Sequence, residues 1–520
     1  MNWQRRNLLS RWVGLAIVMG AALLPTIWLL SGGASLNELS RPFWGSVGRS
    51  LKQGVMVLGL SVAIGWPFGT VLALVKIPGR RLLFCLMAIP IFTPAFLWAI
   101  GLSSFQGYLA YKWRAWFDGF PGAVWASSAQ TLPFVVVGSA LSALVLPQSL
   151  RDSARMASGV RGLFGQAARY NWPAALGAGL FATIFSLSDP GVSQIMGYHS
   201  IATEVLIALG AHYDLHLAAT KALVWAALLL PVLMFASWLV FTRLKGAFFG
   251  RNPQPGLPIN PGLARWFVAA GLLTIAAVVV LPSFSGFFRP LFKGGLAEPI
   301  RFVGAAVRQA WPTTFGVALV SASVATILGL IGNLLCRRES AMIRWLVLCS
   351  FFLLTLPVSL HALGFARILS ILPAWMDPVT RGSSVGLGVC LGLKFVSIPT
   401  LLCLYANNQR SAAQDDTARM HGVPAARYGL KVCLPQILPA ITASAVIVAM
   451  LSVADVAGAL TLQPAGQATL ATRLFAILDN ASERALAVWS LGFVVLGMVG
   501  IGALWIGWDG FQRIAGRRPL

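Results

Sequence analysis

Residues 415–435 read DDTARMHGVPAARYGLKVCLP, a polar interval between two strongly apolar runs of the chain. The pattern predicts two short helices that meet at an elbow. Residues 416–420 form the first helix, and Gly422 supplies the bend because glycine tolerates a positive φ angle. Pro424 suits the first position of the second helix, which we expect to end at the Leu434-Pro435 pair.

A second stretch, residues 152–172, reads DSARMASGVRGLFGQAARYNW and repeats the Ala-Arg-Met triplet of the first. Its elbow glycine is less clear, with Gly159 as the candidate, and it has no Leu-Pro pair. Further matches follow downstream, in the pairs Pro173 and Pro439, Asp189 and Asp455, and residues 197–203 (GYHSIAT) and 466–472 (GQATLAT). Matches at a spacing of about 265 residues indicate an internal repeat.

The composition of the chain indicates whether it lies in water or in a lipid bilayer. Hydrophobic residues make up 57% and charged residues 10% of the 520 residues, against about 25% charged residues in soluble domains. Apolar runs long enough to cross a bilayer recur throughout. The chain is therefore expected to be an integral membrane protein. Its first apolar run is too long for a signal peptide and lacks a clear cleavage site, so we interpret it as an uncleaved span.

The apolar runs predict an all-α polytopic membrane protein with about twelve transmembrane helices. The expected spans are residues 12–30, 51–75, 82–104, 124–146, 173–188, 222–241, 266–281, 313–335, 345–369, 385–404, 437–460 and 486–508. Six spans in each half give two parallel six-helix repeats, in domains 1–249 and 265–520. Residues 250–264, rich in proline and glycine, are expected to form a cytoplasmic linker between them.

Prolines within the expected spans predict kinked or broken helices. They are Pro67, Pro90, Pro94, Pro357 and Pro399. The spacing from Pro94 to Gly101 equals that from Pro357 to Gly364, which extends the repeat into the third and ninth spans. Small-residue pairs such as Gly65 and Gly69, or Gly388 and Gly392, permit close contact between helices.

The distribution of basic residues predicts the orientation. With the N- and C-termini in the cytoplasm, most of the 39 Lys and Arg residues fall on the cytoplasmic side, as the positive-inside rule requires. The bias is incomplete, since Arg289, Arg301 and Arg308 fall outside. Both polar elbows then face the cytoplasm. The net charge of +24 is explained by this topology and by anionic lipid headgroups, and the scattered basic residues do not favour nucleic acid as a partner.

The polar stretches resemble the "EAA" loops of binding-protein-dependent ABC importer permeases. In the second copy, residues 413–435, the matching positions are Asp416, Ala418, Gly422, Leu434 and Pro435. Asp replaces the usual Glu, and Thr417 replaces the first Ala. In the first copy, residues 151–172, the corresponding residues are Asp152, Ala154, Arg155 and Gly159, where Arg155 matches Arg419.

The resemblance implies a type I importer fold, a bacterial inner-membrane location and several partners. Each elbow would dock one of two ATPase subunits, and a periplasmic binding protein would deliver the solute. The chain contains no Gly-x-x-x-x-Gly-Lys-Ser/Thr phosphate loop, so ATP is expected on the separate subunits, and the chain itself is expected to be no enzyme and to bind no cofactor. The chain resembles the fused permeases of iron(III), thiamine and related systems. The resemblance makes iron(III) the first expected solute, followed by thiamine or organophosphonate. The alternative is a secondary transporter with parallel six-plus-six repeats.

Several charged residues have two interpretations. Asp189 and Asp455 are candidates for the translocation path or outer gate, or else caps of helix ends near the interface. Lys394 is expected to snorkel towards the membrane surface. His212 and His216, spaced to share one helix face, are either metal ligands or part of an interfacial helix. The six cysteines contain no Cys-x-x-Cys pair, which argues against a disulfide framework or a zinc site.

Overall fold

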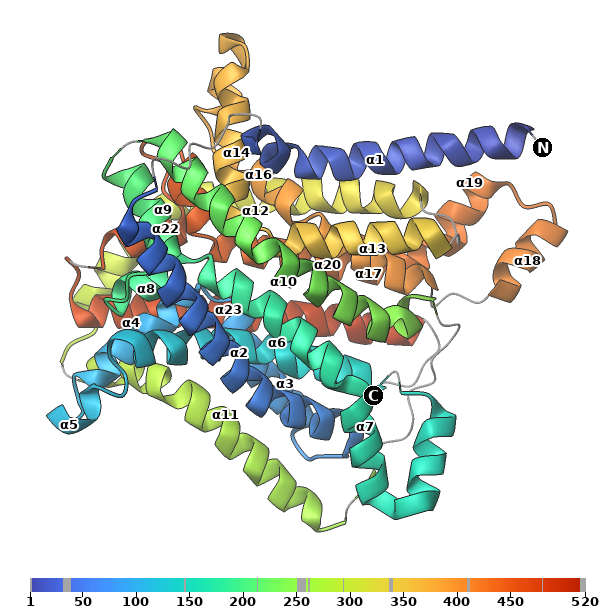
Figure 1. Ribbon diagram of the computed structural model, residues 1–520, viewed down its shortest axis with the longest axis horizontal. Helices are drawn as coiled ribbons and strands as arrows, with labels where there is room; N and C mark the ends of the chain where they lie inside the picture. Colours follow the sequence, from blue (N-terminus) through green and yellow to red (C-terminus); the bar gives the residue numbers. More distant parts are fainter. Residues whose placement is uncertain are drawn as a thin grey trace.

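The computed structural model describes residues 2–30, 39–144, 146–212, 214–249, 259–260, 262–292, 294–335, 340–408, 412–478 and 480–514. These residues form an all-helical protein, in which the membrane-crossing helices run roughly side by side along the long axis (Figure 1). The helices of the N-terminal half are α1 (Asn2–Leu30), α2 (Arg41–Leu74), α3 (Arg80–Ala88), η2 (Ile89–Ile91), α4 (Ala95–Gln106), α5 (Tyr111–Arg114), α6 (Gly119–Leu144), α7 (Gln148–Leu187), α8 (Pro190–Ile195), α9 (Ile201–Gly210) and α10 (Leu215–Phe249).

The C-terminal half contains a similar succession of long and short helices. They are α11 (Ala264–Phe288), η3 (Arg289–Phe292), α12 (Ala297–Leu335), α13 (Ser340–Thr355), α14 (Val358–Ile371), η4 (Ala374–Met376), α15 (Asp377–Thr380), α16 (Val385–Phe395), α17 (Ser397–Asn408), α18 (Ala412–Met420), α19 (Ala425–Tyr428), η5 (Gly429–Cys433), α20 (Leu434–Ala454), α21 (Ala457–Leu462), α22 (Leu470–Ala476) and α23 (Glu483–Ile514).

Within the described residues, eight helices are long and apolar enough to cross a membrane, or up to eleven spans if each of three bent helix pairs counts as one. The prediction of a polytopic all-α membrane protein is confirmed, but the count of twelve is not reached. The difference is the expected span 173–188. It forms the C-terminal part of α7, which begins in the polar loop at Gln148, and α7 is not among these candidate spans.

Two expected spans are sharply broken where their prolines lie. The helix axis turns by 101° between α3 and α4, and by 93° between α13 and α14. Pro94 and Pro357 are the N-cap residues of α4 and α14, and both have extended backbone angles. A proline lacks the amide hydrogen that would continue the helix, and its ring clashes with the preceding turn. The prediction of broken helices is therefore confirmed in the expected spans 82–104 and 345–369. A milder bend of 44° separates α16 from α17, near Pro399.

The first helix of each half packs against the other half. Helix α1 contacts α14, α12 and α13, whereas α11 contacts α4, α3 and α6. Helices α1 and α11 lie at opposite edges of the molecule (Figure 1). The crossings use matched glycines, because an added Cβ would lie 2.3 Å from the carbonyl oxygen of Ser283 at Gly101, and 1.9 Å from that of Pro25 at Gly364. Glycine is required at both crossings because any side chain would overlap backbone atoms.

Small residues also bring neighbouring helices together within each half. A Cβ added at Gly65 or Gly69 of α2 would lie within 3 Å of α6, and one added at Gly388 or Gly392 of α16 would lie within 3 Å of α12. The expectation that these glycine pairs allow close helix contact is confirmed.

Most of the expected linker, residues 250–258 and 261, lies outside the described residues. Its described part is anchored to the first half. Ile259 forms a β-bridge with Val75, in which its amide donates to the Leu74 carbonyl at 2.8 Å and its carbonyl accepts from the Lys76 amide at 2.9 Å. The Ile259 side chain is buried with Leu163 and Ala167 of α7, so this end of the linker packs beside the first polar loop.

Candidate functional site

The second polar stretch forms the predicted elbow. Helix α18 ends at Met420, and Gly422 has a φ angle of 62°. The Val423 amide donates to the Ala418 carbonyl at 3.0 Å, which closes the end of α18. Helix α19 then begins directly after Pro424. A positive φ is readily accessible to glycine, so the prediction that Gly422 forms the bend is confirmed.

The prediction that the second helix ends at Leu434-Pro435 is wrong. A π-helical turn, η5, follows α19 and leads without a break into α20, which starts at Leu434. The Leu434 amide bonds to the Gly429 carbonyl, and Pro435, the second residue of α20, has no amide hydrogen to bond to the preceding π-helical turn. The chain therefore passes from the elbow into the membrane span as one irregular helix.

The first polar stretch bends at Gly159. Helix α7 has non-helical angles at Ser158 and at Gly159, whose φ is 61° and ψ is −141°. This conformation lies close to the region that is nearly restricted to glycine. The uncertain elbow glycine of the first copy is therefore Gly159, and its backbone requires glycine at least as strongly as Gly422 does.

A buried arginine fixes the start of the first elbow. The Arg151 guanidinium donates to the Ala143 carbonyl at 2.7 Å and to the Leu144 carbonyl at 3.1 Å. These carbonyls belong to the last turn of α6, where helix geometry leaves them without amide donors. Burial lowers the pKa of the Arg151 guanidinium, and the neighbouring Asp152 carboxylate partly offsets this effect. The elbow is thus joined to the end of a membrane-spanning helix.

Both elbows project from the same end of the molecule, which also carries the start of α1 (Figure 1). Met156 and Met420, the last residues of the two Ala-Arg-Met triplets, are each 87% exposed. The acidic residues Asp152 and Asp416 and the cation Arg155 are exposed too. Exposed methionines rimmed by charged residues are typical of protein-binding surfaces.

The remaining residues of the EAA-like pattern support the elbows without forming a reactive group. Ala154 and Ala418 are half-buried at matching places, and Pro435 is exposed. Arg419 lies in the last turn of α18. Their coupling role stays a prediction.

Asp189 and Asp455 take equivalent places at the opposite end. The Asp189 carboxylate accepts from the Gly191 amide at 2.8 Å and caps α8. The Asp455 carboxylate accepts from the amides of Gly458 and Ala459, at 3.0 and 3.2 Å, at the start of α21. The expected span 437–460 is therefore interrupted at Asp455. Both acids cap helices, and the two carboxylates lie close enough to repel each other, so these turns of the two halves are neighbours.

Lys394 does not snorkel as expected. Its side chain is 0% exposed, and its ammonium donates to the carbonyls of Leu353, Leu354 and Leu356, at the break between α13 and α14. At the corresponding break in the first half, the Thr93 hydroxyl donates to the Ile89 carbonyl at 3.3 Å. A broken helix at membrane depth must have its freed carbonyls satisfied, and the two halves achieve this with different side chains.

Sequence reasoning missed a buried ion pair at the same end as the acids. The Lys221 ammonium lies 2.8 Å from the Glu204 carboxylate, and the exposed His199 ring lies 3.4 Å from that carboxylate. The pair joins α9 to α10. The two side chains are seventeen residues apart in sequence, and no local pattern connects them.

The histidine pair does not share a helix face. His212 lies in the turn before α10 and His216 in its first turn, while Asp214 caps that helix through a bond from the Leu217 amide. Tyr213 lies outside the described residues. No group of three or more His, Cys, Asp or Glu residues that could hold a metal ion occurs in the described part of the chain, so the histidine pair gains no support as a metal site.

Comparisons with protein-family models, with curated proteins and with solved structures found no match to this chain. The features that bear on function are therefore its own geometry: two exposed elbows at one end, and a capped acid pair with a buried ion pair at the other.

Proposed function

We propose that the chain is the fused transmembrane permease of a binding-protein-dependent ABC importer. The observation that carries the proposal is the pair of glycine elbows, which project from one end of the molecule and each expose a methionine beside charged side chains. Two copies of one surface at one end suit two copies of one partner. In the proposed importer, each elbow inserts into one ATPase subunit in the cytoplasm of a bacterium.

Corresponding features in residues 1–249 and 265–520, which we propose are two equivalent domains, support this proposal. Pro94 and Pro357 start equivalent helices, and Gly101 and Gly364 make equivalent crossings. Ser200 and Thr469 each form a capping box at the start of α9 and α22. Helix α1 packs against the second half and α11 against the first, so motion of one half would be transmitted to the other.

The elbows are suited to couple ATP hydrolysis to transport because each is continuous with a membrane helix. Helix α7 runs from the first elbow to Leu187, next to the Asp189 cap, and η5 with α20 runs from the second elbow to Asp455. Closure of the ATPase pair would move the elbows, and α7 and α20 would carry that motion to the acid pair. The solute, delivered by a periplasmic binding protein, would then pass between the halves. Iron(III) comes first among the solutes of the family that the chain resembles, followed by thiamine and organophosphonate.

The elbow surfaces provide the experiment. Met156→Asp and Met420→Asp, in a tagged chain, should each lower the amount of ATPase that purifies with the chain by about half, and the double variant should remove it. Val379→Asp is the control, since Val379 is an exposed apolar residue of α15 at the opposite end. Full recovery of the ATPase with the double variant would contradict the docking role of the elbows.

A secondary transporter is the second candidate, and one observation favours it. Lys394 is fully buried in α16 and interacts electrostatically with Asp455, and buried charge pairs of this kind accompany ion-coupled transport. This candidate predicts solute movement in liposomes that contain the chain alone, driven by a proton or sodium gradient. The importer predicts none without the ATPase.

A further inference from the structure

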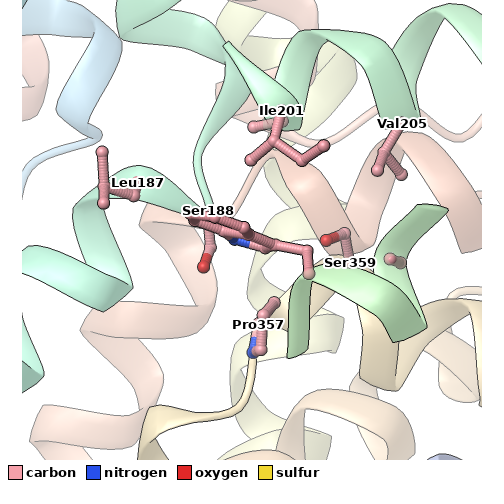
Figure 2. Close-up of a pocket in the computed structure, with 9 residues that line it drawn as sticks. Leu187, Ser188, Ile201, Val205, Pro357 and Ser359 are labelled. Atoms are coloured by element: carbon pink, nitrogen blue, oxygen red, sulfur yellow. The ribbon is translucent and has the colours of Figure 1, made fainter. Parts of the chain in front are cut away.

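Two adjoining hollows lie between the halves, beside the Asp189 turn. They are narrow, because the space inside them is about 10 and 20 Å³, room for about one water-sized group each. Both are lined by Ser188, Ala202 and Val205 from the first half and by Ser359 from the second. Figure 2 shows Ser188 and Ser359 on facing walls, with Ile201 and Val205 above them and Pro357 below.

The equivalent place on the other side of the molecule is filled. Phe96 is fully buried, and its ring packs edge-on against Phe475 at 5.6 Å between ring centroids. Phe96 is the second residue after the N-cap Pro94 of α4, and Ser359 is the second residue after the N-cap Pro357 of α14. A serine therefore stands where the other half has a phenylalanine.

The surroundings of the two residues correspond position by position. Phe96 packs among residues that follow the N-cap of α22. Ser359 lies among residues that follow the N-cap of α9, and each of these is as many residues after its N-cap as its counterpart in α22. The corresponding residues are Ala471, Leu474 and Phe475 in the first case, and Ala202, Val205 and Leu206 in the second. Both aromatic rings of the filled side are thus replaced by smaller side chains, and a narrow hollow remains beside Ser359.

The walls of the hollow define the chemistry of what it can accept. None of its lining residues carries a charge. The Ser188 hydroxyl donates to the Ile184 carbonyl at 2.8 Å and the Thr461 hydroxyl donates to the Ala457 carbonyl at 3.0 Å, so both oxygens remain acceptors. The other lining side chains are mainly aliphatic. Such a wall admits a small uncharged group and opposes an anion, because the desolvation of the anion would be uncompensated and the Asp189 carboxylate lies beside the hollow.

We propose that the hollow at Ser359 receives a small uncharged group of the transported solute, and that the solute path is one-sided, open at Ser359 and closed at Phe96. This inference rests on the proposed function and adds the chemical class of the solute. It favours a solute whose inserted group is uncharged over one that inserts an anion.

Thiol labelling tests the inference without knowledge of the solute. In a chain whose six cysteines are replaced, Ser359→Cys and Phe96→Cys are treated with methyl methanethiosulfonate, which is uncharged, and with its anionic sulfonatoethyl analogue. The cysteine thiolate attacks the divalent sulfur of the probe, the bond from this sulfur to the sulfonyl group breaks, a mixed disulfide forms, and methanesulfinate leaves. We expect the uncharged probe to modify Ser359→Cys at least tenfold faster than Phe96→Cys, and at least tenfold faster than the anionic probe does. Equal rates at the two positions, or faster labelling by the anion, would overturn the proposal.

A second arm separates the hollow from the proposed function. With the ATPase bound, addition of Mg-ATP should change the labelling rate of Ser359→Cys at least threefold, and leave that of Tyr111→Cys, on an exposed outer helix, unchanged. An unchanged rate at position 359 would show a static void and contradict a place on the path. If no ATPase binds the chain, the importer proposal fails, whereas the probe comparison still decides whether the hollow admits uncharged groups. Normal elution of both variants in size-exclusion chromatography confirms that they fold.

Discussion

Replacement of Lys394 tests how the protein stabilises a helix broken inside the membrane. Lys394→Met keeps the length and the apolar stem of the side chain and removes the ammonium. The carbonyls of Leu353, Leu354 and Leu356 then lose their donor. Hydrogen bonds in membrane proteins contribute about 0.6 to 1.7 kcal/mol each, so three lost bonds amount to about 2 to 5 kcal/mol.

Two further effects adjust this figure. Methionine avoids the cost of burying an ammonium, which makes the loss in free energy of unfolding smaller. Asp455 loses its interaction with the lysine, which makes that loss larger. We expect a net decrease of about 2 kcal/mol in the free energy of unfolding. If the two charges interact, the double variant Lys394→Met/Asp455→Asn should lose at least about 0.5 kcal/mol less than the sum of the single variants.

The assay is unfolding of the purified chain in mixed micelles, followed by helical circular dichroism as the fraction of denaturing detergent rises. Ser128→Ala is the matched control, because Ser128 stands five residues before Pro133 as Lys394 stands five before Pro399. The Ser128 hydroxyl makes no hydrogen bond, so this change should stay within about 0.5 kcal/mol of the unchanged chain. A free energy of unfolding of Lys394→Met at or above that of the unchanged chain would refute the reasoning.

Three further predictions concern glycines and one buried amide. Gly101→Ala and Gly364→Ala should each lower the free energy of unfolding in the same assay by about 1 to 3 kcal/mol through overlap with backbone atoms. Gly20→Ala, with no atom within 4 Å of its new Cβ, should not lower it. Equal effects of the three changes would contradict the close helix crossings at Gly101 and Gly364. Gly159→Ala and Gly422→Ala should reduce ATPase recovery with the chain, Gly159→Ala more strongly because its conformation costs a side chain about 1 to 3 kcal/mol. Gly165→Ala, in the regular part of α7 beyond the bend, should have no effect, and the reverse order of the two elbow variants would argue against the backbone explanation. Asn171→Leu, which breaks bonds with Trp66 at 2.6 Å and Thr70 at 2.7 Å, should lower the free energy of unfolding by about 1 to 3 kcal/mol, and a neutral result would remove this cluster as a source of stability.

The sequence was sufficient for features that depend on local pattern. Apolar runs located the membrane helices, and the polar interval with Gly422 predicted an elbow because the required φ is a property of the glycine itself. Pro94 and Pro357 predicted the broken helices for a similar reason. A proline shows where a helix is interrupted, but the size of the turn, about 90° or more, depends on the packing around the break and could not be predicted from the proline alone.

Features that depend on residues distant in sequence could not be predicted from the local sequence pattern. Lys394 was expected to snorkel because nothing near it in the sequence could bind its ammonium. The carbonyls that bind it lie about forty residues earlier in the chain. The ion pair of Glu204 with Lys221 and the interaction of Asp189 with Asp455 likewise require the folded chain. The hollow at Ser359 became visible only when its surroundings could be compared with those of Phe96.

The most direct test of the importer account is mild-detergent purification of the tagged chain from its native membranes, with quantitative mass spectrometry of the proteins that accompany it. The account predicts an ATPase at about two copies per chain, one for each elbow. Recovery of a stable chain without any ATPase, able to move solute along an ion gradient, would contradict the account and establish a secondary transporter.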